Sequence, residues 1–316
     1  MYPTRNFETT GKSQIAWPDS VSRVSLKKLI WLIGLLLCIS GWQACYAQNA
    51  VSDFPTVGAV SESPTDNYHP GKAIWVDLVT TDVAAAATFY RRVFGWEFNY
   101  LAEGTYAQAS FMGRPVGAIT LYEEDQAVAG DAQWLVSFSS TNIDKAAKKV
   151  IKAGGKVLEE PQDLDGRGRF VVISDPAGAE LMLLHATGGD PADRPSRINE
   201  WLWAELWTSD TKAAAGFYRD VLGLKSMIVD DISGEPYMLM GRDGIARAGV
   251  VKLPFEDVEP NWLPYILVES IKDTVDSIEK HGGNLVMAPG ESADQVVAAI
   301  VSDPTGGVFA IQQRRK

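Results

Sequence analysis

The chain has 316 residues, enough for about two domains, and its 46% hydrophobic and 22% charged residues are typical of a globular protein with a packed core. Its net charge of −11 would repel a phosphate backbone, so nucleic acid is excluded as an expected partner. The charge is uneven, because residues 1–47 carry more basic than acidic side chains and the remainder is strongly acidic.

The basic first 47 residues predict a signal peptide or a membrane anchor. Lys27 and Lys28 precede the apolar segment LIWLIGLLLCISGW, whose length of about 14 residues suits a signal peptide better than the ~20 needed to span a bilayer. Small residues at Cys45 and Ala47 place a cleavage site before Gln48. We therefore expect an exported, periplasmic protein. A retained membrane anchor is the alternative, and lipidation at Cys45 matches the sequence less well.

Both cysteines, Cys38 and Cys45, lie in this segment. Cleavage would leave a body without thiolate metal ligands or cysteine nucleophiles. Residues 48–71 are rich in Ser, Pro, Thr, Asp and Gly and predict a flexible linker. A second linker is expected over residues 188–197, which are rich in Gly, Asp, Pro and Arg.

The body of the chain repeats itself at an offset of 128 residues. The segment WVDLVTTDVAAAATFYRRVFGW (75–96) matches WAELWTSDTKAAAGFYRDVLGL (203–224), and later matches keep the same offset. A constant offset over so long a stretch indicates tandem homologous domains, which we place at residues 72–187 and 198–313.

A fainter repeat runs inside each domain at an offset of 60 residues, with the shared order of strand, turn, helix and glycine. Asp82 and Asp210 are suited to cap the helices that follow them, and Gly95 and Gly223 are suited to end them. Alternating short segments such as Tyr106–Phe111 predict the strands that follow each helix. The body is therefore expected to contain four βαβββ modules, two in each domain.

The paired modules, the helix start D-x-x-x-A-x-x-F-Y and a late D-P-x-G turn resemble the vicinal oxygen chelate superfamily. It includes glyoxalase I, extradiol dioxygenases and bleomycin- and fosfomycin-resistance proteins. The resemblance covers about residues 72–313. It implies an α+β fold of two tandem glyoxalase-like domains, in which two βαβββ modules form a curled, mostly antiparallel sheet that makes a cup around a ligand cavity. Metal enzymes of the superfamily carry His, Gln or Glu on first strands and Glu on last strands, facing into the cup.

The resemblance also implies where a metal site would lie in this chain. The corresponding positions are Trp75, Leu135 and Met182 in the first domain and Trp203, Leu263 and Ala310 in the second. None of these side chains is a good ligand for a hard or borderline divalent metal. The three histidines, His69, His185 and His281, fall outside the ligand positions. We therefore expect no metal and no other cofactor, with a divalent metal held by a different set of residues as the alternative.

Strand alternation predicts which side chains face into the cups. The residues expected to face the cavity and bind a ligand are Trp75, Asp77, Glu180 and Met182 in the first domain and Trp203, Glu205 and Gln312 in the second. Asp77 and Glu205 are the candidate polar groups for recognition or for acid–base catalysis. On the other interpretation they only stabilise the sheet, by accepting hydrogen bonds from backbone amides or from an arginine such as Arg114, Arg169 or Arg247. Tyr106 and Tyr237 begin comparable strands. Core packing is their expected role, and a position at the rim of the pockets is the alternative.

Three functions remain open from the sequence. The first is an exported protein that binds a small, partly apolar molecule in one or both cups without the family's metal. The second is an enzyme of the same fold, a lyase, isomerase or dioxygenase, acting through another metal set or through Asp77 or Glu205. The third is a structural protein whose cups are filled by their own side chains. The expected partner is a small molecule, with possible membrane attachment through the N-terminal segment.

Overall fold

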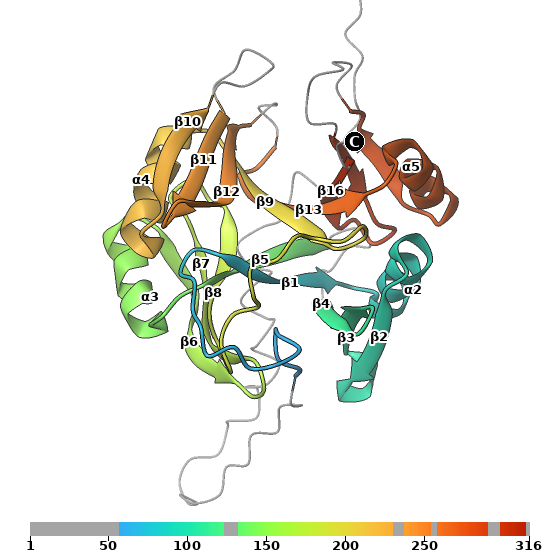
Figure 1. Cartoon of the computed structure of the whole chain (residues 1–316), viewed down its shortest axis with the longest axis horizontal. Coiled ribbons are helices and arrows are strands. Elements are labelled where there is room, and N and C mark those ends of the chain that lie inside the picture. Colours follow the sequence, from blue (N-terminus) through green and yellow to red (C-terminus); the bar gives the residue numbers. More distant parts are fainter. Residues whose placement is uncertain (1–56, 123–131, 230–236, 254–257, 290–297, 314–316) are drawn as a thin grey trace, which may run out of the picture.

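The computed structural model describes residues 57–122, 132–229, 237–253, 258–289 and 298–313. They form two eight-stranded sheets, one from each half of the body, with the helices on the outside (Figure 1). The predicted signal peptide, its cleavage site and both cysteines lie outside the described residues. None of the described helices is long and apolar enough to cross a bilayer.

The two domains repeat the same order of elements. The first contains β1 (Ala73–Thr80), α2 (Val83–Phe94), β2 (Glu97–Leu101), a 3-10 turn (Ala102–Gly104), β3 (Tyr106–Phe111), β4 (Arg114–Leu121), β5 (Gln133–Ser139), α3 (Ile143–Lys152), β6 (Lys156–Leu164), β7 (Gly168–Ser174) and β8 (Glu180–Ala186). The second contains β9 (Trp201–Thr208), α4 (Thr211–Leu222), β10 (Lys225–Val229), β11 (Tyr237–Arg242), β12 (Ile245–Lys252), β13 (Asn261–Val268), α5 (Ile271–Lys280), β14 (Asn284–Met287), β15 (Ala298–Ser302) and β16 (Val308–Gln313).

The helix boundaries follow from capping, as the sequence predicts. The Asp82 side chain accepts a hydrogen bond from the amide of Ala85, and Asp210 does the same for Ala213, at 2.8 and 2.9 Å. Gly95 ends α2 with a φ of 73°, a left-handed conformation that a side chain would strain. The equivalent glycine ends α4 in the same way.

The sheet order confirms the predicted α+β fold of paired βαβββ modules. The strands follow the orders β2-β3-β4-β1-β5-β8-β7-β6 and β10-β11-β12-β9-β13-β16-β15-β14. Within each module the first strand pairs in parallel with the last, as β1 does with β4 and β5 with β8. The modules then join through antiparallel pairing of β1 with β5, and of β9 with β13. All other neighbouring pairs are antiparallel.

The two faces of each sheet bury different cores. Val76 and Leu78 pack on the helices in one large core that both domains share. Trp75, Leu135 and Met182 face the other way, into a separate apolar cluster that we call the first cup. The second cup contains its own cluster, which includes Trp207, Leu263, Tyr265 and Ala310. The predicted alternation of side chains along the first strands is therefore confirmed.

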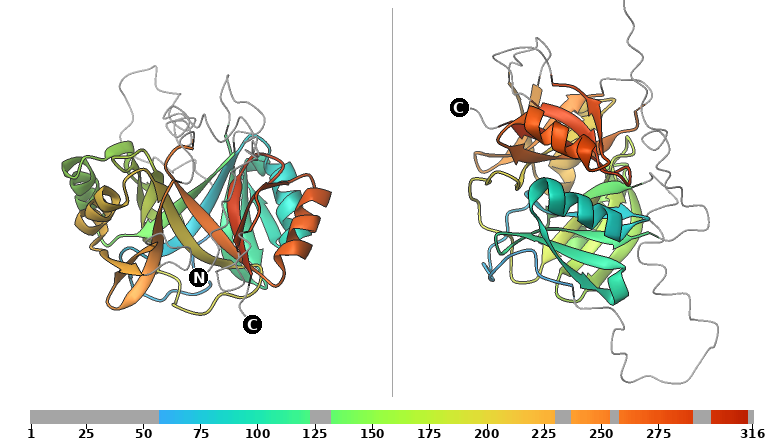
Figure 2. Two further views of the ribbon diagram at one scale, coloured as in Figure 1. Left: turned by 90° about the horizontal axis from the view of Figure 1, so that it is seen from above. Right: turned by 90° about the vertical axis from the view of Figure 1, so that its right-hand side faces the viewer.

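The domains pack with α2 against α5 and α3 against α4, so the helices lie in pairs at two opposite sides of the molecule (Figure 2). A buried tyrosine crosses the interface in each direction. Tyr90 of α2 donates a 2.8 Å hydrogen bond to Asp303 of the second domain, and Tyr218 of α4 donates one of 3.1 Å to Asp175 of the first. Each acceptor is the aspartate of a D-P-x-G turn, and its other oxygen accepts amide hydrogen bonds within that turn.

Residues 57–71 have the composition of a flexible linker but not the structure of one. These residues pack on the first domain instead of extending into solvent: the amide of Val57 bonds the carbonyl of Asp165, and the side chain of Val60 is buried in the first cup. Thr65 donates a hydrogen bond to the carbonyl of Asp190 in the second linker. The prediction of a flexible linker is therefore wrong for this part of residues 48–71, because its backbone groups and one apolar side chain find partners.

Candidate functional site

The first cup contains a buried ion pair, and its acidic member lies on β1. Asp77 accepts a hydrogen bond of 2.9 Å from the indole of Trp75 and lies 3.7 Å from the guanidinium of Arg167. Arg167 is 2% exposed, and its guanidinium stacks 4.0 Å from the centre of the Trp75 ring. Burial raises the pKa of Asp77, and the positive charge of Arg167 acts against that shift. The negative charge of Asp77 is thus balanced by a residue of the protein itself, Arg167.

Arg167 is a residue that the sequence interpretation missed. The arginines expected to pair with the cup carboxylates are engaged elsewhere, Arg114 with Glu62 and Glu200, Arg169 with Asp144 and Asp163, and Arg247 with Asp193. The amide of Thr187 bonds the carbonyl of Arg167, which holds the residue just ahead of β7. Because Arg167 lies in the turn before the strand, strand alternation gave no signal for it.

Tyr106 does more than pack in the core. Its hydroxyl accepts a 2.6 Å hydrogen bond from Arg167, and burial raises its pKa to about 12. The expectation of core packing alone is therefore incomplete for Tyr106. Tyr237 occupies the corresponding strand in the second domain and also reaches a cup carboxylate, as described below.

The first cup is covered by the chain itself. The carbonyl of Gly58 accepts a hydrogen bond of 3.1 Å from Arg167, and Val60 is 3% exposed in the apolar cluster. A side chain at position 58 would collide with the side-chain amide of Gln108 on β3. Residues 57–60 thus pack on the first cup through the Gly58 carbonyl and the Val60 side chain.

Two other predicted residues, Glu180 and Met182, also face into the first cup from β8. Met182 pairs in register with Ser137, whose buried hydroxyl has no hydrogen-bond partner in the described residues. Glu180 is buried, its side chain forms no hydrogen bond or ion pair with any described residue, and burial raises its pKa to about 7. Glu180 is thus a polar group in an apolar cup, and it forms no hydrogen bond or ion pair with Asp77 or Arg167.

The second cup holds its carboxylate with neutral donors. Oε1 of Glu205 accepts hydrogen bonds from the indole of Trp207 at 2.9 Å and the hydroxyl of Tyr265 at 2.8 Å, and Oε2 accepts one of 2.8 Å from Tyr237. Burial and the nearby charge of Glu205 raise the pKa of Tyr265, which keeps that phenol a donor. No ion pair joins Glu205 to a basic side chain of the described residues.

This arrangement leaves one acceptor position on Glu205 that no described residue occupies. A carboxylate has about four lone-pair directions, and three are occupied. Trp203 stands beside it, half-buried, with its indole donating to Tyr237 at 3.2 Å. Gln312 lies on the same face of β16 as Ala310 and is also half-buried. Tyr265, which the sequence interpretation did not single out, has the same strand parity as Leu263 and so was open to prediction.

The strand positions that carry metal ligands in enzymes of the related fold hold apolar residues in both cups. The strand register adds one position to those already predicted, because Ala118 pairs with β1 as Met182 pairs with β5. By the same register the added position in the second cup is Gly249. The described residues contain no group of three or more His, Cys, Asp or Glu side chains placed to hold a metal ion. These residues therefore do not fit a divalent metal.

Paired βαβββ modules that form one cup per domain define a tandem glyoxalase-type protein. The sequence model of the Glyoxalase/Bleomycin resistance protein/Dioxygenase superfamily matches residues 72–183. The anthracycline biosynthesis protein DnrV of Streptomyces peucetius is 30% identical over 269 residues, which cover 79% of this chain and 95% of DnrV. The chain belongs to the Glyoxalase/Bleomycin resistance protein/Dioxygenase superfamily.

Further relatives and solved structures agree with this assignment. The Mycobacterium tuberculosis protein CFP32, which carries a glyoxylase name, is 28% identical over 248 residues, covering 77% of this chain and 95% of CFP32. The Mn(II)-bound glyoxalase from Novosphingobium aromaticivorans has a TM-score of 0.56 at 18% identity, covering 78% of this chain and 83% of its own. The 2,3-dioxygenase LapB from Pseudomonas has a TM-score of 0.54 at 12% identity, covering 78% and 92%. At these identities the structural likeness shows the fold alone.

Proposed function

We propose that the protein binds a small, partly apolar molecule in the second cup, without the metal that enzymes of the superfamily use there. The observation that carries the proposal is Glu205, a buried carboxylate held by three neutral donors, with one acceptor position that no residue in the described part of the chain occupies. A pocket with an apolar wall and few oriented polar groups is the usual form of a small-molecule site.

The contrast between the cups supports this choice. In the first cup the carboxylate is paired with Arg167, and residues 57–60 cover it. The tryptophan at the corresponding position is buried in the first cup, as Trp75, and half-buried in the second, as Trp203. The first cup therefore fits the self-filled interpretation and the second fits the ligand-binding one.

The chemistry of Glu205 limits the ligand. A carboxylate accepts hydrogen bonds and cannot donate, so the bound molecule must present a donor such as a hydroxyl group. The indole of Trp203 favours a flat apolar body beside that donor. The anthracycline biosynthesis relatives agree with this class, because anthracyclines are flat aromatic molecules that carry hydroxyl groups.

The test uses 2-naphthol as the probe and 2-methoxynaphthalene as its analogue without a donor. We expect 2-naphthol to raise the melting temperature of the wild-type protein, and Glu205→Gln to weaken its binding about tenfold, the loss of one charge-assisted hydrogen bond. Gly249→Ala should act similarly, since its new methyl group would collide with the Tyr237 hydroxyl and come within 3.0 Å of Nε1 of Trp203.

Three comparisons make this result decisive. Gly216→Ala places a methyl group in open space on α4 and should leave binding unchanged, as should Asp77→Asn in the first cup. The methoxy analogue should bind more weakly than 2-naphthol. Equal binding by wild type and Glu205→Gln would refute the assignment to the second cup.

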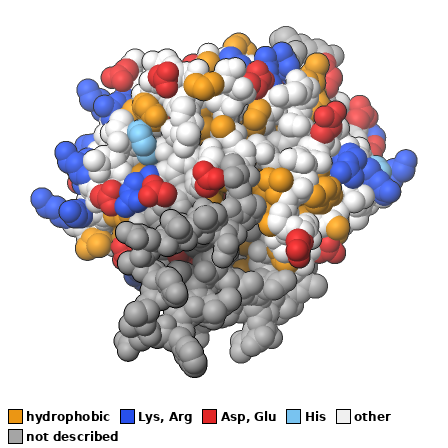
Figure 3. All heavy atoms as spheres, turned by 90° about the horizontal axis from the view of Figure 1, so that it is seen from below, with side chains coloured by type: hydrophobic (Ala, Val, Ile, Leu, Met, Phe, Trp, Pro, Cys, Tyr) orange, Lys and Arg blue, Asp and Glu red, His pale blue; other side chains and the backbone are white. Residues whose placement is uncertain are grey.

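We also propose that the protein is exported and acts on small molecules instead of nucleic acid. Its net charge is −11, and on the face shown in Figure 3 basic side chains are interspersed with acidic ones. Fractionation of a bacterium that expresses the full chain should place the protein in the periplasm, with an N-terminus at Gln48. An intact N-terminus in the membrane fraction would instead identify a retained anchor.

A further inference from the structure

A pocket of about 800 Å³ lies where the two domains and their connecting segments meet. Its walls come from residues 60–65 of the N-terminal segment, residues 191–196 of the linker, and the first residues of β1, β4, β9 and β12. Neither Asp77 nor Glu205 lines this junction pocket, so it is distinct from the polar groups of both cups. Its volume is within the range that holds small organic molecules.

Three tryptophans from the first strands of the two domains line the junction pocket, Trp75, Trp201 and Trp203. Their indole N–H groups are already used, by Asp77 at 2.9 Å, by the carbonyl of Val116 at 2.6 Å and by Tyr237 at 3.2 Å. The rings therefore offer apolar surface and no free donor to the pocket. Such a wall favours a flat, apolar ligand body.

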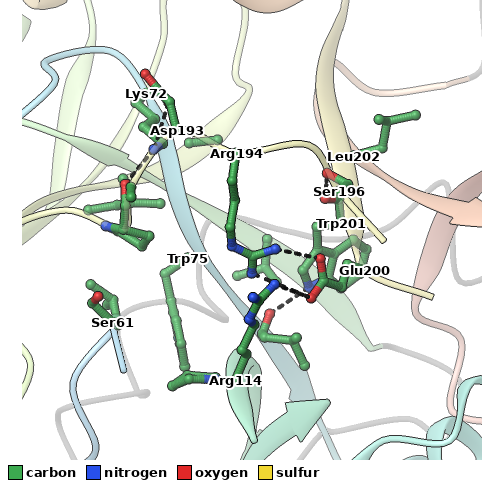
Figure 4. A pocket seen from close by; sticks show the side chains of 18 of the residues that line it. Ser61, Lys72, Trp75, Arg114, Asp193, Arg194, Ser196, Glu200, Trp201 and Leu202 are labelled. Carbon is green, nitrogen blue, oxygen red and sulfur yellow. Dashed lines mark hydrogen bonds and ion pairs between the residues drawn. The ribbon is translucent and has the colours of Figure 1, made fainter. Parts of the chain in front are cut away.

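At one end of the pocket two guanidinium groups share one buried carboxylate. Arg194 bonds Glu200 at 2.7 and 3.4 Å, and Arg114 lies 3.6 Å from the same carboxylate, as Figure 4 shows. Burial acts to raise the pKa of Glu200, but the hydrogen bonds from Arg194 and from the Arg197 amide outweigh it and the pKa is lowered. Glu200 is therefore ionised and balances only one of the two arginines.

The second partner of Arg114 is weakly held. Glu62 contacts Arg114 at 2.9 Å, but its side chain is 49% exposed, and an ion pair to so exposed a group contributes little. Arg114 itself is 23% exposed and faces the pocket, where Figure 4 shows it close to Trp75 and opposite Arg194. Its charge is thus available to a ligand that displaces Glu62.

A similar excess of positive charge occurs at the other end. Lys72 and Arg247 share Asp193 at 2.8 and 2.7 Å, and the hydrogen bond from Arg247 holds the pKa of Asp193 well below its usual range. The pocket is therefore lined by four basic and three acidic side chains on a protein whose net charge is −11. This local excess of cations favours an anionic ligand.

We propose that the junction pocket binds a small aromatic anion, a carboxylate or a sulfonate. Its negative group takes the place of Glu62 beside Arg114 and Arg194, where guanidinium forks match the geometry of a carboxylate or sulfonate. Its ring packs against the tryptophan wall. This site differs from the second cup in its polar groups, although Trp203 lines both.

The probe for this site is 1-anilinonaphthalene-8-sulfonate, whose fluorescence rises when it enters an apolar pocket. We expect one saturable site per chain in the purified protein. Arg114→Gln should weaken binding about tenfold, since it removes a charge-assisted hydrogen bond but leaves the Arg194–Glu200 pair in place. Glu62→Gln should strengthen binding several-fold, because it removes the competing carboxylate.

The controls separate charge from apolar binding. Arg169→Gln, an arginine that pairs with Asp144 and Asp163 outside the pocket, should bind the sulfonate as the wild type does. The neutral analogue N-phenyl-1-naphthylamine should not distinguish wild type from Arg114→Gln. The proposal is overturned if Arg114→Gln binds the sulfonate normally or if Glu62→Gln weakens it. If Arg114→Gln does not fold, the binding measured for Glu62→Gln tests the proposal by itself.

Discussion

Replacing Arg167 with methionine is expected to lower the free energy of unfolding by about 3–5 kcal/mol, the usual loss when one partner of a buried ion pair is removed. The change leaves Asp77 in the first cup with only the Trp75 indole, and it also removes the donor to Tyr106 and to the carbonyl of Gly58. Chemical denaturation at pH 7 measures the loss.

The double variant Asp77→Asn with Arg167→Met tests the cause. Removing the uncompensated charge should recover most of the lost stability, whereas Arg169→Met, which breaks ion pairs to exposed partners, should change it little. The loss of stability caused by Arg167→Met should also depend on pH. Burial raises the pKa of Asp77 and the positive charge of Arg167 opposes that shift, so Arg167→Met raises the pKa of Asp77 further. At the lower pH Asp77 can take up a proton in the folded variant, and Arg167→Met should therefore be less destabilising at pH 5 than at pH 8. A loss independent of both pH and Asp77 would show that packing, and not charge, is responsible.

Replacing Gly168 with alanine should be at least as damaging, with a loss of roughly 4 kcal/mol or more. Gly168 has a φ of +127°, which side chains rarely adopt, and a methyl group there would collide with the carbonyl oxygen of His185 and lie 2.9 Å from the amide of Thr187. Both are backbone atoms, one in β8 and one directly after it, and they cannot move aside without disturbing the β7–β8 pairing.

Gly113→Ala is the matched control for this prediction. Gly113 has a φ of +80°, but a methyl group there would meet nothing within 4 Å. Its substitution should therefore cost only the conformational strain, about 1–2 kcal/mol. Equal losses for the two variants in a denaturation experiment would mean that strain alone, and not the collision with β8, limits position 168.

The fold was predictable because its signals are local and repeated. The capping aspartates, the helix-ending glycines and strand alternation each depend on a few neighbouring residues, and two copies of every signal stand at a fixed offset. The cup-facing positions of Trp75, Asp77, Trp203 and Glu205 followed from alternation alone.

The alternation of residues along a strand does not show which other segments of the chain contact the cup. Arg167 comes from a turn, and Val60 comes from a segment whose composition is that of a linker. The two carboxylates looked equivalent in the sequence, but they have different partners: Asp77 meets a cation and Glu205 meets two phenols and an indole. Their distinct roles could be inferred only from the three-dimensional structure.

The crossed contacts of Tyr90 and Tyr218 have the geometry of a two-fold homodimer held within one polypeptide. In such an isologous interface the residue that reaches across and the residue that receives it belong to both subunits. Here each half of the body supplies one tyrosine and one turn aspartate. Excised from the chain, either half would expose a self-complementary surface and should associate with another copy of itself. Because the two halves belong to one chain, their sequences can differ. One cup can therefore be closed by the N-terminal segment while the other keeps a carboxylate position for a ligand.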